Sequence, residues 1–132
     1  MLPPGIHDAT LREVEDKLAY NAVRRELFEG FRRACEALKR AGCSVVYLDG
    51  SFVTEKPTPA DFDACWDDAG VDASKLDKVL LDFTNKRKAQ KERFLGELFP
   101  AALPAAPGSV FIAFFQTDKH TGNAKGILRI RL

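Results

Sequence analysis

The apolar residues of this chain recur at two periods, and each period predicts a different kind of element. Between 21 and 40, apolar residues return every three or four positions with arginines between them, which predicts an amphipathic helix. A shorter helix is predicted over 11–18, because Asp8 or Thr10 can cap its first turn. The same helical spacing from 74 to 98 predicts a third and longer helix.

Short runs of apolar and β-branched residues predict strands. The first strand is predicted over 44–48, where it leads directly into a Gly-Ser turn, and the second over 61–66. Two later runs, 109–115 and 126–132, are predicted to form a hairpin around a turn at 120–123. These elements predict an α/β (α+β) fold with a small mixed sheet of about four strands and helices packed on one side.

Length and composition agree with one domain over residues 1–132. A chain of 132 residues can bury most of its apolar surface without disulfides or metals. Its 45% hydrophobic and 30% charged residues are ordinary for a soluble globular protein. No apolar run approaches the roughly 20 residues that a membrane span needs, and the N-terminus has no signal-peptide pattern. A cytoplasmic protein without membrane contact is therefore expected.

The cysteines predict neither a disulfide framework nor a zinc site. Cys35, Cys43 and Cys65 are an odd number, and their spacing matches no zinc motif. Each lies beside apolar residues in a predicted element. We therefore expect three reduced and mostly buried thiols.

Candidate chemistry is concentrated around a Gly-Ser turn and a pair of aspartates. Gly50 lets the backbone approach a phosphate closely, and Ser51 offers a hydroxyl and an N–H. In the second predicted strand, Asp61 and Asp63 project from one face while Phe62 enters the core on the other. Mg²⁺ prefers hard oxygen ligands and is often held by one or two carboxylates together with substrate phosphates. The pattern predicts a site for a magnesium-bound nucleoside triphosphate.

The order of these residues resembles the signature of the nucleotidyltransferase superfamily of DNA polymerase beta type. That signature is a hydrophobic residue, Gly, Gly or Ser, a spacer, and then Asp-x-Asp or Asp-x-Glu. Here Leu48, Asp49, Gly50 and Ser51 precede Asp61-Phe62-Asp63 by nine residues. The chain is also similar to a group of small bacterial nucleotidyltransferase-like proteins that are often carried by phages and mobile elements. This similarity runs nearly end to end, through segments 2–7, 48–54, 59–63, 97–100, 114–116 and 122–127.

The resemblance implies transfer of a nucleoside monophosphate from a nucleoside triphosphate to an RNA, protein or small-molecule acceptor. In the superfamily, two Mg²⁺ ions are held by the Asp-x-Asp pair, here Asp61 and Asp63, and by a third carboxylate on a neighbouring strand. Gly50 and Ser51 are then implied as nucleotide-binding residues. A toxin–antitoxin or phage-defence context, with a partner protein from the same locus, is also implied.

Basic side chains on the third predicted helix are a second candidate feature. The net charge is only +1, which argues against bulk electrostatic binding to nucleic acid. One side of this helix nevertheless gathers Lys86, Lys88, Lys91 and Arg93. This side is either an ordinary solvated face or a surface that contacts phosphate or RNA. Lys88 and Lys91 are the residues that we expect to bind the nucleotide in the second case.

The third carboxylate is the point at which the sequence departs from the superfamily pattern. Neither late strand offers an inward-facing acid, because 109–115 is apolar and 126–132 carries arginines. Arg131 is a candidate for the place of the acid, and pairing with Asp61 or Asp63 would then give a degenerate site. Asp82 and Asp118 are alternative carboxylates outside the strands.

Three classes of function therefore stay open. The first is an active magnesium-dependent transferase. The second is a catalytically silent module that binds a nucleotide or a partner protein. The third is a structural domain, because Asp-x-Asp and Gly-Ser are also common in ordinary turns.

Overall fold

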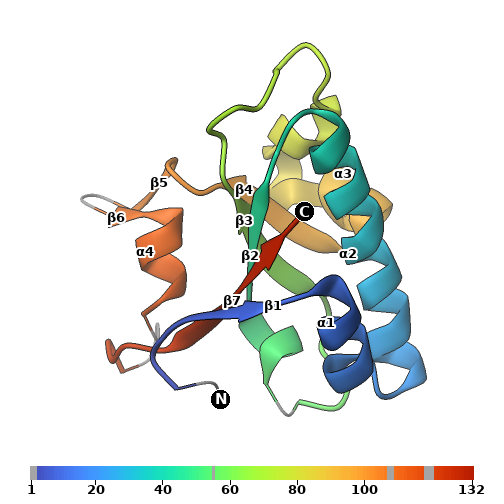
Figure 1. The fold of residues 1–132 in the computed structure, drawn as a ribbon, viewed down its shortest axis with the longest axis vertical. Helices are drawn as coiled ribbons and strands as arrows, with labels where there is room; N and C mark the ends of the chain where they lie inside the picture. The colour runs from blue at the N-terminus through green and yellow to red at the C-terminus, as the bar shows by residue number, and fades with distance from the viewer. Residues whose placement is uncertain (1–2, 55, 107–108, 118–120) are drawn as a thin grey trace.

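A five-stranded mixed sheet runs through the centre of the molecule, with strand order β1-β7-β2-β3-β4 (Figure 1). The computed structural model describes residues 3–54, 56–106, 109–117 and 121–132. The strands of the sheet are β1 (Gly5–Ala9), β2 (Val45–Asp49), β3 (Phe62–Trp66), β4 (Gly96–Pro100) and β7 (Gly126–Arg131). A short ribbon consists of β5 (Pro104–Ala106) and β6 (Ser109–Val110). The helices are α1 (Leu11–Leu18), α2 (Ala22–Arg40), α3 (Thr84–Phe94) and α4 (Phe111–Phe115), with 3-10 turns η1 (Gly50–Val53) and η2 (Lys78–Leu81).

The two helices predicted near the N-terminus are confirmed as α1 and α2. Thr10 and Glu13 form a capping box at the start of α1, in which each side chain accepts a hydrogen bond from the other's backbone N–H at 3.1 Å. Asn21 caps α2 by accepting a hydrogen bond from an N–H of its first turn at 2.9 Å. The buried face of α2 lies on the sheet, where Phe31 meets Phe62 edge-on with 5.2 Å between ring centroids.

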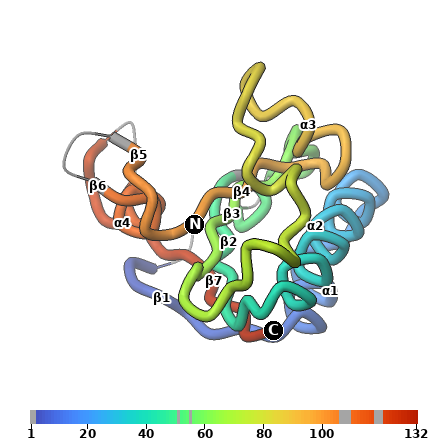
Figure 2. The backbone as a smooth tube through the Cα atoms, turned by 90° about the horizontal axis from the view of Figure 1, so that it is seen from above, coloured from blue at the N-terminus to red at the C-terminus, as the bar shows by residue number. Residues whose placement is uncertain are grey.

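The mixed α+β class is confirmed, although the layers differ from the expectation. Helices α1, α2 and α3 lie on one side of the sheet, and α4 lies on the other (Figures 1 and 2). The side of α4 has its own smaller core, made of Cys65, Phe99, Ala101, Phe115 and Ile127. The prediction of about four strands is also corrected. The fifth strand is β1, because the N-terminal arm pairs in parallel with β7.

The long helix predicted over 74–98 is wrong, because this segment holds three elements, η2, α3 and β4. The chain leaves the helix at Leu95, which has a left-handed φ of 65°. At Gly96 a Cβ would overlap the ring of Phe62, so only glycine allows the two strands to lie this close. From there β4 pairs in parallel with β3 along its whole length. Part of the apolar pattern therefore belongs to a strand.

The hairpin predicted near the C-terminus is wrong in its first half. Only 109–110 form a strand, β6, and the rest forms α4, whose helical spacing brings Phe111 and Phe115 to one neighbour, Phe99, at centroid distances of 4.1 and 6.5 Å. The second half is confirmed as β7, which pairs with β2 instead. Residues 118–120, which include part of the predicted turn, lie outside the described residues.

Two expectations drawn from composition can be compared with the structure. Cys35, Cys43 and Cys65 are free and buried, as predicted. Burial raises the pKa of each thiol, which keeps it protonated. In the described part of the chain, no helix combines the length and the apolar character that crossing a membrane requires.

Arg24 is a fully buried cation of α2, and backbone carbonyl groups surround its guanidinium. Nη1 donates to the carbonyl oxygens of Leu18 and Phe52, at 3.0 and 2.7 Å. Nη2 donates to those of Thr54 and Lys56 at 2.7 and 2.6 Å, and Nε donates to Lys56 at 3.1 Å. These bonds fasten the segment that follows the Gly-Ser turn to the first turns of α2.

Replacing Arg24 with lysine should destabilise the protein by about 2 kcal/mol or more, because one ammonium cannot reach all of these carbonyls and each buried carbonyl left without a donor costs about 1–3 kcal/mol. Urea unfolding followed by circular dichroism measures the change. Arg25→Lys is the matched control, since Arg25 is the exposed neighbour on the same helix, and its effect should stay below about 0.5 kcal/mol. Equal effects of the two substitutions would contradict the role given to Arg24.

Candidate functional site

Strand β3 lies between β2 and β4, and the two registers bring acidic residues side by side. Asp63 of β3 is opposite Asp49 of β2 and opposite Glu97 of β4. The preceding residue, Phe62, is fully buried in the core beneath the helices, so Asp63 points to the other face. Asp61 lies just before β3, and its charge acts on Asp63. We call Asp49, Asp61, Asp63 and Glu97 the acidic cluster.

Burial makes the three aspartates of the acidic cluster difficult to ionise, and repulsion between carboxylates adds to this for Asp61 and Asp63. Burial raises the pKa of Asp63 to about 7, and the nearby charges of Asp61, Glu97 and Asp49 add to this effect. Burial also raises the pKa of Asp61, with Glu97 as the next cause. The pKa of Asp49 is raised by burial as well. A cation placed among these carboxylates would relieve the repulsion.

Basic side chains contact two members of the acidic cluster. Nζ of Lys91 and Nη2 of Arg87 each lie 3.0 Å from Oε1 of Glu97. Nζ of Lys125 lies 3.0 Å from Oδ2 of Asp49. Burial acts to raise the pKa of Glu97, but the bonds to Lys91 and Arg87 outweigh burial, and this pKa is lowered. The site therefore holds anions that suit a metal ion beside cations that suit phosphate.

Gly50 makes room for the carboxylate of Asp63. Its φ is +81°, a conformation that favours glycine. A Cβ at this position would overlap Oδ2 of Asp63. The sequence predicts that Gly50 allows a phosphate to approach the backbone, and the structure adds this close contact with an acid. Ser51 follows in η1, and its side chain lies outside the described part of the structure.

A left-handed turn at the start of α3 brings Arg87 to the acidic cluster. Asn85, Lys86 and Arg87 have φ values of 51°, 57° and 61°. The left-handed conformation costs roughly 1–2 kcal/mol for each such residue, and it persists only where surrounding contacts hold it, often at functional sites. Here Arg87 bonds to Glu97, and its guanidinium carbon lies 5.7 Å from the ring centroid of Phe99.

The two lysines predicted to bind a nucleotide have different surroundings. Lys91 joins the acidic cluster through Glu97. Lys88 does not, because its Nζ lies 3.9 Å from Oε1 of Glu92 and 69% of its side chain is exposed. The basic side of α3 is therefore divided between a part at the cluster and a part in solvent.

Glu97 is a carboxylate on the strand next to Asp63 that the sequence did not reveal. Arg131, expected in its place, is exposed and lies 3.9 Å from Asp8 at the opposite edge of the sheet. Asp82 accepts hydrogen bonds from the hydroxyl and N–H at the start of α3, and Asp118 lies outside the described residues. Glu97 falls inside the long helix predicted from the sequence. The signal for a strand was the short run Glu97-Leu98-Phe99, bounded by a glycine and a proline.

Three more residues of the site were also missed. Asp49 belongs to the quoted motif, and Arg87 falls within the helix predicted over 74–98. Lys125 lies in segment 122–127, which carries part of the resemblance. Within the described ranges, no three His, Cys, Asp or Glu side chains already surround one point as metal ligands.

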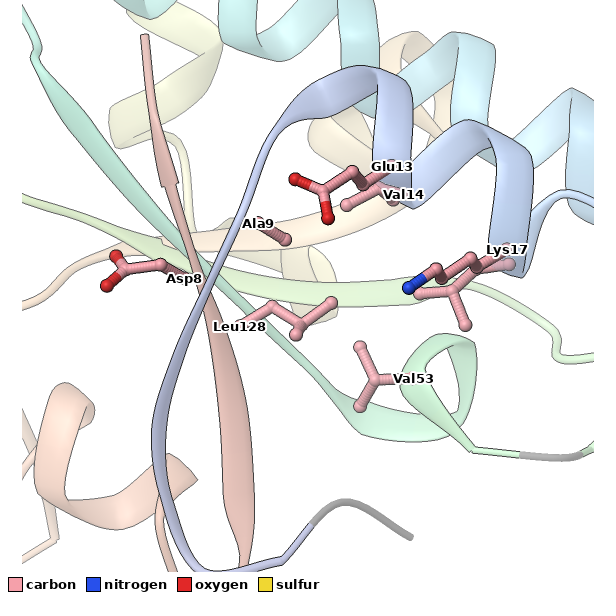
Figure 3. Close-up of a pocket in the computed structure, with 8 residues that line it drawn as sticks. Asp8, Ala9, Glu13, Val14, Lys17, Val53 and Leu128 are labelled. Atoms are coloured by element: carbon pink, nitrogen blue, oxygen red, sulfur yellow. The ribbon is translucent and has the colours of Figure 1, made fainter.

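A separate cavity of about 190 Å³ lies between α1, β1, β7 and η1 (Figure 3). Val14, Val53 and Leu128 provide apolar walls, whereas Asp8 points away from them. Asp8 accepts a hydrogen bond from Arg129 at 2.7 Å. This cavity lies at the β1 edge of the sheet and the acidic cluster at β3 and β4, so the two are distinct.

Asp63→Asn should stabilise the protein at about pH 8 in the presence of a chelator and change it little near pH 4. Folding raises the pKa of Asp63 from 3.8 to about 7. The wild type therefore has its full stability below about pH 4, where Asp63 is protonated in both states, and it loses stability as the pH rises to about 7. Since one pKa unit corresponds to about 1.4 kcal/mol, the gain at alkaline pH should be at least about 2 kcal/mol. Thermal unfolding between these pH values measures the gain. Asp68 is exposed, so Asp68→Asn is the control and should have the same stability as the wild type at both pH values. If Asp63→Asn is no more stable than the wild type at about pH 8, the raised pKa of Asp63 is refuted.

Gly50→Ala should destabilise the protein by at least about 1 kcal/mol more than Gly122→Ala. Both glycines have positive φ, but an added Cβ meets Asp63 at Gly50 and open space at Gly122. The difference in urea unfolding therefore isolates the overlap with the carboxylate. Similar losses in the two variants would mean that only backbone strain acts at Gly50.

Comparison with known proteins places the chain in a family. No curated protein and no solved structure matches it. A family model described as a family of unknown function (DUF6932) matches residues 1–131. This range includes the acidic cluster and the basic residues that contact it. The chain therefore belongs to the DUF6932 family.

Proposed function

We propose that the protein is a cytoplasmic, magnesium-dependent nucleotidyltransferase that transfers a nucleoside monophosphate from a nucleoside triphosphate to an acceptor hydroxyl. The observation that carries the proposal is the position of Asp61, Asp63 and Glu97 on adjoining segments beside the turn at Gly50. The resemblance to the polymerase beta-type superfamily implies the same set, an Asp-x-Asp pair and a third acid on a neighbouring strand. Glu97 supports the proposal because it lies opposite Asp63 on a neighbouring strand, where the sequence predicted no inward-facing acid.

The residues of the acidic cluster fit magnesium in their chemistry. Carboxylate oxygens are the ligands that Mg²⁺ prefers. Burial raises the pKa of Asp63 most, and a divalent cation would also offset the repulsion that adds to this effect. To complete a three-carboxylate site, Glu97 would exchange its contacts with Lys91 and Arg87 for the metal. When bound, one or two Mg²⁺ ions would supply the positive charge that stabilises the transferred phosphoryl group and the leaving pyrophosphate.

The chain's own cations would bind and orient the triphosphate. Lys91, Arg87 and Lys125 are held at the cluster by Glu97 and Asp49. Once the carboxylates have another counterion, these side chains can turn to phosphate oxygens. In the reaction, the acceptor oxygen would bond to the α-phosphorus as the bond from this phosphorus to the bridging oxygen breaks. Pyrophosphate and the hydroxyl proton would leave.

One observation favours a second function, a catalytically silent binding module. Glu97 and Asp49 already have internal counterions, so the cluster can persist without a metal. Such a module would bind a nucleotide or a partner protein, for example one from a toxin–antitoxin or phage-defence locus. Its binding would depend neither on Mg²⁺ nor on the charge of Glu97.

Calorimetric titration with ATP, GTP, CTP and UTP, each with and without Mg²⁺, tests the proposal. We expect at least one of them to bind only when Mg²⁺ is present. Glu97→Gln keeps the size of the side chain and removes its charge, so it should weaken this binding by about tenfold or more, equal to about 1.4 kcal/mol. Release of pyrophosphate in the presence of RNA or protein acceptors then measures transfer.

The matched control is Glu92→Gln, because the Glu92 side chain is 68% exposed on α3 and lies outside the acidic cluster. This variant should bind nucleotides like the wild type. Binding that survives both Glu97→Gln and the removal of Mg²⁺ would favour the silent module. A wild-type protein that binds no nucleotide at all would contradict the proposal.

A further inference from the structure

We infer that a groove beside Asp61 binds the base of the nucleotide whose phosphates meet the acidic cluster, with a preference for a base that carries an amino group. The inference rests on the proposed function, because it takes the ligand to be a nucleoside triphosphate. It gives α2 a role in ligand binding, although α2 contributes nothing to the acidic cluster itself.

The groove has a volume of about 420 Å³ and lies between α2, the segment before β3 and the end of α3. Val23 and Leu27 line it from α2, Pro59 from the segment before β3, and Leu95 from the end of α3. Sites for small ligands commonly have volumes of about 300–1,000 Å³ and mostly apolar walls. The size and the lining of the groove suit a flat heteroaromatic ring between aliphatic side chains.

Two residues connect the groove with the acidic cluster. Asp61 lines the groove and is a member of the cluster. Lys91 also lines the groove, and its Nζ lies 3.0 Å from Glu97. A molecule that fills the groove therefore reaches the carboxylates at one end. A nucleotide has this form, since an apolar ring is joined through a ribose to a chain of phosphates.

Glu26 is the polar group that can orient the ring. It lines the groove from α2, and within the described part of the chain its carboxylate has no hydrogen-bond or ion-pair partner. An ionised carboxylate only accepts hydrogen bonds. It therefore favours a base edge with an amino group, as in adenine, cytosine or guanine. Uracil presents carbonyl oxygens on both sides of its single ring N–H, so it should bind more weakly.

Val23→Trp tests the groove by filling it. Val23 is 39% exposed, so a larger side chain can enter the groove without displacing the core. The probes are ATP and inorganic tripolyphosphate, each with Mg²⁺, because tripolyphosphate has the phosphates but no base. The Kd for ATP should rise about tenfold or more in Val23→Trp, while the Kd for tripolyphosphate should change by less than about twofold.

Two further variants sharpen the test. Leu81→Trp is the matched control, because Leu81 is 48% exposed and does not line the groove, and it should leave both Kd values unchanged. Glu26→Gln keeps the shape of the side chain and should reduce the ratio of ATP to UTP affinity. If Val23→Trp fails to fold, as a thermal melt would show, an unchanged ratio in Glu26→Gln would by itself overturn the inference.

The outcomes separate the inference from the proposed function. A wild type that binds neither probe with Mg²⁺ would refute both. A wild type that binds ATP and tripolyphosphate, with ATP binding unaffected by Val23→Trp, would refute only the base site. An equal loss of affinity for ATP and for tripolyphosphate in Val23→Trp would also refute only the base site, because the substitution would then weaken the binding of the phosphates.

Discussion

The register of β3 is the constraint on which the rest of the structure depends. Its pairing with β2 and β4 places Asp49 and Glu97 on either side of Asp63. A slip of one residue would turn every side chain of β3 to the opposite face, so that an acid entered the core and an aromatic ring left it. Phe62 opposes this slip, because its ring occupies the space that the missing side chain of Gly96 leaves free. The apolar side of the strand therefore positions its acidic side.

This register imposes an electrostatic cost that the surrounding residues reduce only in part. Lys91 and Arg87 compensate Glu97, and Lys125 compensates Asp49. Among the described residues Asp63 has no such ion-pair partner, and its pKa is the one raised furthest within the cluster, to about 7. Fold stability alone would favour a neutral residue at this position. Here carboxylates and basic side chains lie side by side in internal ion pairs. This arrangement is expected of a site in which a metal cation replaces the basic side chains at the carboxylates and an anionic ligand binds the basic side chains.

The sequence predicted the aspartate pair and the helices around it because their signals are local. A cap, a helical period or a short apolar run can be recognised within a few residues. Glu97 could not be placed in this way, because its neighbours also fit a helix and the deciding contact, between Gly96 and Phe62, joins distant segments. The same is true of Phe111–Phe115, where an aromatic run typical of a strand forms a helix against Phe99. Tertiary packing overrides local preference at both places.

The first turns of α2 connect the proposed groove with the acidic cluster. Asn21 donates a hydrogen bond to the carbonyl oxygen of Pro57 at 2.7 Å, and Arg24 donates to those of Phe52, Thr54 and Lys56. The fastened segment begins at the Gly-Ser turn and leads to Asp61. The helix that provides one wall of the groove therefore also fixes the chain that carries the opposite wall and the first acid. Because the α2 wall, the opposite wall and Asp61 depend on one set of hydrogen bonds, a ligand would find these parts already in place, and only the ion pairs of Glu97 and Asp49 would have to rearrange.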